Sequence, residues 1–407
     1  MDNTLLGLSN RRPGRIRPEL GPLRATLHRL GDPQFRFPSI LIVGTNGKGS
    51  TAAMLEGILR AHGLRTGLNT SPHLVAVEER IRIDGRDIER VVLEGHLDRL
   101  SAESELTFFE TITTAAFLAF AAAGIEVAIL EAGMGGSWDA TRAAVSEIAG
   151  ITNVGSDHAQ WLGDTAEERA GDKGAPLRSA SWAVKGPGFD SALAGALAAP
   201  HAFEAGKLVG LEVVDTGVVR LSWGECVVEA TPPLPGVHQI ANLHLAMALA
   251  RCAESAGIID RLEPGAVLDG LARVRWSGRL SECRVNGRRI LLDGAHNLEG
   301  AVVLADELRQ REIKPGLLFS CLDDKPAEAM AQVLAPVVGH VVVCSLDDER
   351  AAPIDRLAAA FDGADRATGI RAGLAMLDDP VVAAGSLRLV GRLLELADPG
   401  GVPCATE

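Results

Sequence analysis

Ser39-Ile40-Leu41-Ile42-Val43-Gly44-Thr45-Asn46-Gly47-Lys48-Gly49-Ser50-Thr51 is the stretch of sequence that decides the fold class. Its first five residues are mostly apolar and β-branched, as in a buried strand, and residues 51–62 then show helical spacing up to Gly63, a helix-ending residue. A strand, a glycine-containing loop and a helix in this order predict a site for phosphate groups at the helix N-terminus.

The loop between that strand and that helix has the residue types that ATP requires. Its glycines let backbone N–H groups face the phosphates, Lys48 can reach the outer phosphates, and the hydroxyl of Ser50 or Thr51 can approach a metal ion. The strict phosphate-loop motif has a glycine where Ile42 stands, so a glycine-rich turn without a ligand is the alternative interpretation. We predict that the ATP-binding loop consists of Gly44, Thr45, Asn46, Gly47, Lys48, Gly49, Ser50 and Thr51.

Further apolar runs are typical of strands in a parallel sheet that is buried on both faces. Residues 127–130 and 148–152 form two such runs, and four more follow Trp276. With helical patterns between them, they predict an α/β fold, in which a central parallel sheet domain carries the phosphate loop and a smaller Rossmann-like α/β domain follows. We place the boundary near residue 277, so the expected domains are 1–276 and 277–407. The four later runs are residues 289–292, 317–320, 341–343 and 381–384.

Charge and cysteine usage narrow the classes of partner. The chain has 40 basic and 53 acidic residues among 407, a formal net charge of −13, which opposes binding to nucleic acid or to an anionic membrane surface. The first 17 residues contain no apolar signal region, and the six cysteines form no C-x-x-C pair. We therefore expect a cytoplasmic monomer with reduced thiols that acts on small molecules, with no membrane span and no nucleic-acid partner.

A series of motifs along the chain resembles one family. The loop Gly-Thr-Asn-Gly-Lys resembles that of the Mur ligase superfamily, and Gly-Lys-Gly-Ser resembles its folylpolyglutamate synthase/dihydrofolate synthase branch. The resemblance extends from about Leu30 to Gly391, and a collinear set of this kind is more specific than any single motif. The other matching segments are residues 70–74, 79–81, 106–110, 130–136, 157–158, 162–165, 293–297 and 385–387.

This resemblance implies a reaction. The family consists of ATP-dependent ligases that join L-glutamate to the carboxylate of dihydropteroate or a folate through an acyl phosphate. A Mur-type ligase that acts on a different carboxylate and an ATP-binding regulatory relative without turnover are the alternatives. The resemblance leaves open whether one or both folate reactions are catalysed.

Magnesium ions are the expected cofactor, because phosphoryl transfer needs charge neutralisation. Ser71 and Glu131 each follow a strand or turn and offer oxygen ligands, although Glu131 could also be a capping carboxylate. His158 suits zinc or general base catalysis on its chemistry alone, whereas the resemblance makes it a third Mg²⁺ ligand. The resemblance also implies a second Mg²⁺ held by Lys173 in carbamylated form, and a solvent-exposed lysine is the alternative.

The remaining site residues are assigned by the same resemblance. Asn242, Arg279 and Asp293 would bind ATP, and the catalytic residues would be Lys48, Lys173 and His296. The substrate-binding residues would be His73, Thr107, Phe108, Phe109, Glu110 and Asp139. Two segments depart from the family pattern: Ser137-Trp138 with Arg142, and residues 11–18. Both belong to the pterin side, so the acceptor is less well specified by the sequence than the reaction.

Overall fold

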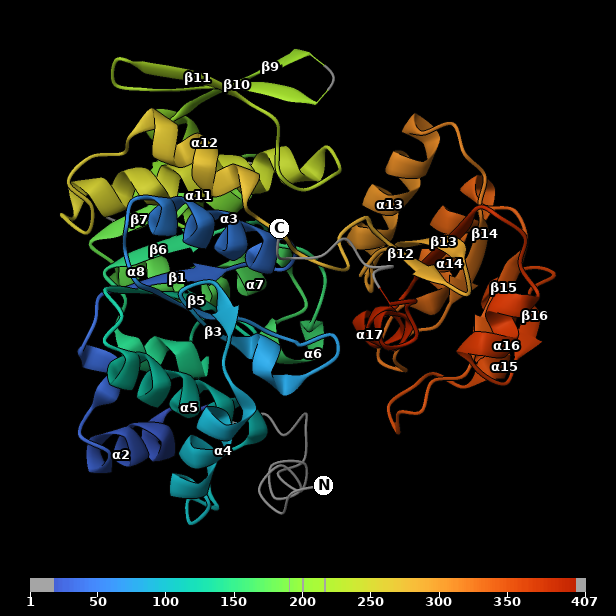
Figure 1. Ribbon diagram of the computed structural model, residues 1–407, viewed down its shortest axis with the longest axis horizontal. Helices are drawn as coiled ribbons and strands as arrows, with labels where there is room; N and C mark the ends of the chain where they lie inside the picture. The colour runs from blue at the N-terminus through green and yellow to red at the C-terminus, as the bar shows by residue number, and fades with distance from the viewer. Residues whose placement is uncertain (1–17, 190, 200, 216, 400–407) are drawn as a thin grey trace. The chain divides into compact units, whose positions relative to one another are not determined.

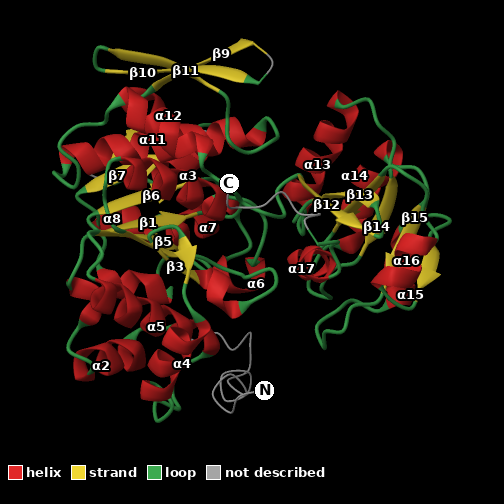
Figure 2. Ribbon diagram, viewed as in Figure 1, coloured by secondary structure: helices red, strands yellow, loops and turns green. Residues whose placement is uncertain are grey.

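The computed structural model describes residues 18–189, 191–199, 201–215 and 217–399, which fold into two compact units (Figure 1). The first unit contains residues up to His73, Val77–Pro233 and Gln239–Val274. The second contains Leu74–Ala76, Leu234–His238 and the chain from Arg275 onward. The α/β fold predicted from the sequence is confirmed, with a large mostly parallel sheet in the first unit and a smaller sheet in the second (Figure 2).

The sheet of the first unit has eight strands in the order β4-β3-β2-β5-β1-β6-β7-β8. Strands β2, β5, β1, β6, β7 and β8 are parallel, and β3 and β4 add an antiparallel edge. Every residue of the central strand β1 is buried, as its apolar sequence predicts. The strands are β1 (Ser39–Val43), β2 (Thr66–Asn69), β3 (Ile81–Ile83), β4 (Arg86–Asp87), β5 (Val127–Glu131), β6 (Ile148–Ile151), β7 (Trp182–Lys185) and β8 (Ala202–Glu204).

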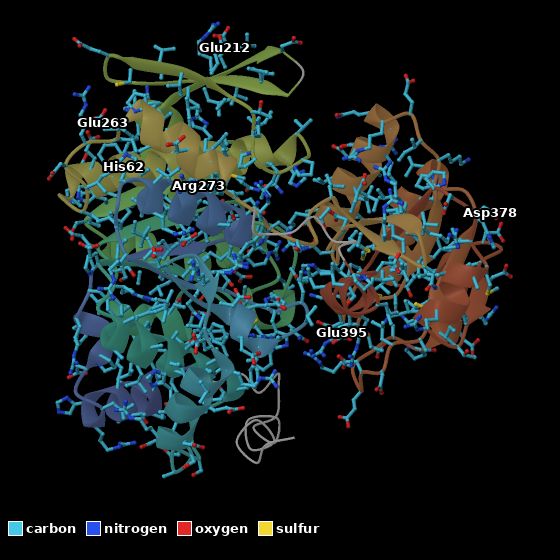
Figure 3. All side chains as sticks on the ribbon, viewed as in Figure 1. His62, Glu212, Glu263, Arg273, Asp378 and Glu395 are labelled. Carbon is cyan, nitrogen blue, oxygen red and sulfur yellow. The ribbon has the colours of Figure 1, made fainter. Side chains whose placement is uncertain are left out.

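Helices cover both faces of this sheet, with α3, α11 and α12 on one side and α2, α4 and α5 on the other (Figure 1). Helices α3 and α12 pack so closely that a Cβ on Gly57 would lie 2.9 Å from the carbonyl oxygen of Gly270. At the end of the same pair, the backbone N–H of Glu263 donates to Nε2 of His62 at 2.9 Å (Figure 3). The longer helices are α2 (Gly21–Arg29), α3 (Lys48–Ala61), α4 (Arg90–Arg99), α5 (Phe108–Ala123), α7 (Ala166–Lys173), α11 (His238–Ser255) and α12 (Pro264–Ala272).

Two features of the first unit go beyond the sequence-based expectations. Helix α3 begins at Lys48 rather than at Thr51, so the lysine and both hydroxyls lie in its first turn. An antiparallel sheet of β9 (Gly210–Asp215), β10 (Val218–Trp223) and β11 (Cys226–Ala230) was not expected. The short helices are η1 (Pro33–Phe35), η2 (Val77–Arg80), η3 (Ala140–Ala144), α6 (Ala159–Leu162), α8 (Ala175–Ser179), α9 (Ser191–Ala196) and α10 (Ala205–Leu208).

The second unit has a six-stranded sheet in the order β12-β13-β17-β14-β15-β16, in which only the β12–β13 pair is antiparallel. All four runs expected after Trp276 are strands of this sheet. Its strands are β12 (Ser281–Val285), β13 (Arg288–Leu292), β14 (Gly316–Phe319), β15 (Val341–Cys344), β16 (Asp365–Ala367) and β17 (Val381–Ala384). Its helices are α13 (Leu298–Gln310), α14 (Ala327–Leu334), η4 (Ala335–Val337), α15 (Ile354–Ala360), α16 (Ile370–Ala375) and α17 (Leu387–Glu395). In the described residues of the whole chain, no helix is long and apolar enough to cross a membrane.

Candidate active site

The phosphate loop joins β1 to α3 in a conformation that only glycine adopts easily. Gly44 and Gly47 have φ angles of +136° and +84°. A Cβ on Gly44 would lie 2.0 Å from Oγ1 of Thr152, and one on Gly47 would lie 2.2 Å from Oδ1 of Asn242. The two glycines therefore let the loop pack against the end of β6 and against Asn242 of α11.

Asn153 also holds this loop, although its role was not predicted from the sequence. Its Oδ1 accepts a hydrogen bond from the backbone N–H of Asn46 at 2.9 Å, and its Nδ2 donates to the carbonyl of Asn46 at 3.0 Å. In addition, the backbone N–H of Gly155 donates to Oγ1 of Thr45 at 2.8 Å. The signal for Asn153 was its position, because it follows a buried strand that is the parallel neighbour of β1.

Polar groups in the first turn of α3 are placed for an anion and its metal. Nζ of Lys48 donates to the carbonyls of Gly44 and Thr45, at 3.2 and 3.0 Å. The hydroxyls of Ser50 and Thr51 are buried without a hydrogen-bond partner in the described part of the chain. A buried hydroxyl without a partner is costly, so this turn is suited to ligand oxygens or a cation.

Two strand ends beside the loop carry the expected metal ligands. Glu131, the last residue of β5, is 6% exposed, and its Oε2 accepts a hydrogen bond from the backbone N–H of Ser71 at 3.0 Å. Beyond β6, His158 has a left-handed backbone and its Nε2 lies 3.8 Å from Oδ2 of Asp157. Because β2, β5, β1 and β6 are adjacent parallel strands, these residues share one edge of the sheet with the phosphate loop. No cluster of three His, Cys, Asp or Glu side chains suited to a metal ion occurs within the residues described.

Lys173 is the last residue of α7 and is only 1% exposed, so the alternative of a solvent-exposed lysine is wrong. Burial, aided by the nearby charge of Lys48, lowers the pKa of its ammonium group to about 8, while Asp172 and Asp157 oppose this shift. Lys173 therefore loses its proton at a lower pH than an exposed lysine does.

Aromatic and basic side chains gather on the expected acceptor side of the first unit. The guanidinium of Arg80 lies 5.0 Å from the centre of the Phe108 ring, and its Nε donates to Nδ1 of His73 at 2.9 Å. Phe109 packs against Gly133, where a Cβ would lie 2.7 Å from the ring. Phe109 therefore contacts the loop that follows β5, and Arg80 connects His73 to Phe108.

Thr107, Glu110 and Asp139 have structural partners that the resemblance did not indicate. Thr107 caps α5 and forms a reciprocal capping box with Glu110, a pattern that the Thr-x-x-Glu spacing could have revealed. Asp139 accepts hydrogen bonds from the backbone of Gly133, Met134 and Thr141 and from the Thr141 hydroxyl. Burial raises the pKa of its carboxyl group. The polar atoms of all three residues are thus used to shape the protein itself.

The nucleotide residues expected in the second unit form a group of their own. Asp293 follows β13, and its carboxylate accepts hydrogen bonds from the backbone N–H of Leu280 at 3.1 Å and of Ala295 at 2.8 Å. Burial raises the pKa of this carboxyl group, and the charge of Arg279 opposes the shift. Nδ1 of His296 donates to the carbonyl of Gly294 at 2.7 Å.

Two family models match the chain: the Mur ligase middle domain at residues 42–173, and the Mur ligase, glutamate ligase domain at residues 278–400. The dihydrofolate synthase/folylpolyglutamate synthase of Mycobacterium tuberculosis is 34% identical over 383 residues, covering 85% of this chain and 78% of that protein. The chain belongs to the dihydrofolate synthase/folylpolyglutamate synthase family. A probable bifunctional folylpolyglutamate synthase/dihydropteroate synthase of Haloferax volcanii is 33% identical over 374 residues, covering 85% of this chain but only 43% of that longer protein.

Solved structures of this family superpose well on the chain. M. tuberculosis folylpolyglutamate synthase complexed with ADP gives a TM-score of 0.86 at 31% identity, covering 98% and 99% of the two chains. Escherichia coli FolC in complex with DHPP and ADP gives 0.85 at 26%, covering 97% and 96%. A bifunctional folylpolyglutamate synthase/dihydrofolate synthase with Mn, AMPPNP and L-glutamate bound gives 0.84 at 28%, covering 96% and 97%.

Proposed function

We propose that this chain is an ATP-dependent ligase that joins the amine of L-glutamate to the carboxylate of dihydropteroate or a folate through an acyl phosphate. The observation that carries the proposal is the phosphate loop, in which two close-packed glycines, Lys48 and two buried hydroxyls meet at one helix N-terminus. Family members with bound ADP, DHPP or L-glutamate support the same assignment. In this proposal residues 1–276 bind ATP and the pterin acid, and residues 277–407 form the ligase domain.

Each step of the proposed reaction is assigned to particular residues of the chain. Backbone N–H groups of the loop bind the phosphates, and Lys48 exchanges its two carbonyl partners for the outer phosphates. The acceptor carboxylate then takes the γ-phosphoryl group and releases ADP, and the glutamate amine displaces phosphate from the acyl phosphate. His296 is the residue proposed for the proton transfer, because its Nδ1 donates to the carbonyl of Gly294 and this hydrogen bond orients the ring.

The donors near the loop fit magnesium, which binds oxygen ligands. Ser71, Glu131 and His158 would hold one ion, and the unpartnered Ser50 and Thr51 hydroxyls lie in the same region of the site. Lys173 in carbamylated form would hold the second ion, because its lowered pKa provides the neutral amine that captures carbon dioxide. Bound Mg²⁺ would neutralise charge on the phosphates. Asn242, Arg279 and Asp293 complete the proposed nucleotide contacts, and His73, Phe108 and Phe109 are the best-placed candidates for the acceptor.

The net charge of −13 supports small-molecule partners rather than nucleic acid or anionic membranes. We extend the proposal to a monomer that works in the cytoplasm. Sedimentation at working concentration would test the monomer, and a single species of about twice the chain mass would contradict it.

A panel of carboxylate substrates tests the function. The purified chain is incubated with ATP, Mg²⁺, L-glutamate and, in turn, dihydropteroate, tetrahydrofolate and unrelated aromatic acids. We expect ADP release and an amide product by mass with one or both pterin acids. Product formation only with an unrelated acid would show that the acceptor is a different carboxylate, a result that the altered Ser137-Trp138 segment would explain. Nucleotide binding without ADP release from any acid would support a regulatory relative instead.

A further inference from the structure

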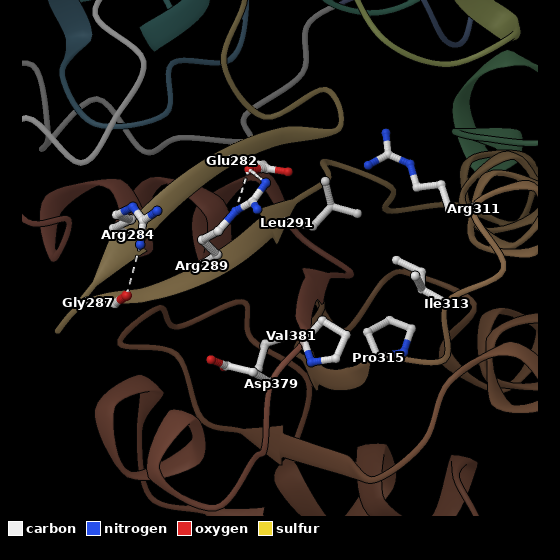
Figure 4. A pocket seen from close by; sticks show the side chains of 11 residues that line it. Glu282, Arg284, Gly287, Arg289, Leu291, Arg311, Ile313, Pro315, Asp379 and Val381 are labelled. Atoms are coloured by element: carbon white, nitrogen blue, oxygen red, sulfur yellow. Dashed lines mark hydrogen bonds and ion pairs between the residues drawn. The ribbon is translucent and has the colours of Figure 1, made fainter. Parts of the chain in front are cut away.

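A cavity of about 580 Å³ opens on the second unit, at the end of its sheet where the parallel strands begin (Figure 4). That volume lies in the range of small-ligand pockets. Its wall is formed by one face of the β12–β13 hairpin, by the segment between α13 and β14, and by the residues at the start of β17. Asp293 and His296 follow the opposite end of β13, so the cavity is separate from the candidate nucleotide residues of this unit.

Three arginines line the cavity. Arg284 and Arg289 stand directly opposite each other on the two strands of the hairpin, and Arg311 follows α13. Like charges at directly opposed positions of an antiparallel pair destabilise the pair. An arrangement that costs stability without a ligand becomes favourable when an anion lies between the two guanidinium groups.

The acidic groups around the cavity neutralise these arginines only in part. Glu282 accepts two hydrogen bonds from Arg289, and Glu307 accepts one from Arg311 at 2.7 Å. Asp379 also lines the cavity, but it pairs with Arg288 at 2.9 Å. Arg284, in contrast, forms no ion pair with any described residue, and its Nη1 donates to the carbonyl of Gly287 at 3.2 Å.

The remaining wall is apolar. Leu291, Ile313 and Pro315 contribute to it, and Leu291 and Pro315 are largely shielded from solvent. Guanidinium groups beside an apolar wall favour a ligand that combines several anionic groups with a carbon skeleton, rather than a single inorganic ion.

We propose that this cavity is a second binding site, which takes a small multivalent anion carrying carboxylate or phosphate groups. Arg284 is its main anchor, Arg311 binds from the other side, and Arg289 is shared between the ligand and Glu282. The site does not depend on the ligase reaction, because none of the residues that line it is among those proposed to bind ATP or to catalyse the reaction.

Calorimetric titration of the full chain tests this site with two probes, inorganic tripolyphosphate and γ-linked triglutamate. We expect at least one probe to bind, and the one that binds distinguishes a phosphate ligand from a carboxylate ligand. Arg284→Ala should weaken binding about tenfold or more, the usual effect of losing a charge-assisted hydrogen bond. Arg309→Ala is the matched control. Arg309 belongs to α13, two residues before Arg311; it pairs with Asp306 and does not line the cavity.

Glu282→Gln should raise the affinity for the probe, because it removes the carboxylate that pairs with Arg289. A folding defect cannot produce such an increase. The proposal is overturned if neither probe binds at millimolar concentration, if Arg284→Ala and Arg309→Ala weaken binding equally, or if Glu282→Gln leaves the affinity unchanged. Binding that is lost in Lys48→Ala and retained in Arg284→Ala would place the anion on the phosphate loop and would also overturn it.

Discussion

Lys173 is the residue whose chemistry the structure constrains most. It is buried, and its pKa of about 8 makes the amine reactive toward carbon dioxide. If the carbamate forms and binds a metal, Lys173→Ala should be nearly inactive, and short carboxylic acids should restore part of the activity by taking the vacant ligand position. Lys173→Arg should not recover, since guanidinium remains a cation. Initial rates of ADP release with and without added acetate measure the effect, and full activity of Lys173→Ala would exclude the carbamate.

The same lysine should make the stability of the unliganded chain depend on pH. The folded pKa of about 8 lies below the ordinary lysine value of 10.5. The unfolded chain therefore binds more protons between these two values, and the contribution of Lys173 makes stability rise with pH in that window. The buried cysteines, whose raised pKa values lower the stability at high pH, are common to both proteins. The difference in denaturant midpoint, wild type minus Lys173→Met, should therefore rise from pH 8 to 10.5. Parallel curves for the two proteins would mean that the amine is not desolvated.

A substitution at Asp139 can distinguish a structural role of this residue from a direct contact with the substrate. Its carboxylate accepts four hydrogen bonds within the protein. Asp139→Asn replaces one accepting oxygen by an amide donor, so we expect a loss of about 1–3 kcal/mol of unfolding free energy even without substrate. Thermal unfolding of the unliganded variant measures this loss. Unchanged stability of the variant together with a raised KM for the pterin acid would instead support the direct substrate contact that the family resemblance implies.

Among the elements of the fold, the phosphate loop makes the sharpest prediction. Gly44→Ala places a Cβ 2.0 Å from Oγ1 of Thr152 and within 3.2 Å of two backbone nitrogens. Gly63→Ala is the control, because Gly63 also has a positive φ, at the other end of α3, but a Cβ added there would meet no atom within 4 Å. Both variants carry backbone strain from a positive φ, which costs roughly 1–3 kcal/mol. Only Gly44→Ala should lower ADP affinity, by tenfold or more in fluorescence titration, and equal affinities for the two variants would contradict the packing role of Gly44.

The elements that carry the site were predictable where a strand is buried on both faces. The runs at residues 39–43, 127–130 and 148–152 are largely apolar, and the polar residues that directly follow two of them, Glu131 and Asn153, mark the edge of the sheet. The antiparallel sheet at residues 210–230 was missed because its strands are partly exposed and carry charges such as Glu212 (Figure 3), which pairs with Arg220. Its pattern therefore lacks the apolar continuity that identified the other strands.

At the scale of the whole molecule, the fold class and the family were accessible from collinear motifs, several of which lie directly after a strand. Partners across the sheet were not accessible. The hydrogen bonds between Asn153 and Asn46 join residues 107 positions apart. The opposed arginines of the β12–β13 hairpin likewise become visible only when the strand register is known. Sequence motifs thus indicate which residues react, whereas the structure indicates which residues hold them.

The central claim is that the acceptor carboxylate is activated by direct attack on the γ-phosphate of ATP. Dihydropteroate or folate labelled with ¹⁸O in both carboxylate oxygens tests it, with L-glutamate, ATP and Mg²⁺ and with Lys48→Ala as the inactive control. If an acyl phosphate forms, one labelled oxygen must pass to phosphate when the amine displaces it. Mass spectrometry should therefore find ¹⁸O in the inorganic phosphate in proportion to the amide, with ADP as the nucleotide product. Amide formation with unlabelled phosphate, or with the label in AMP, would contradict the account.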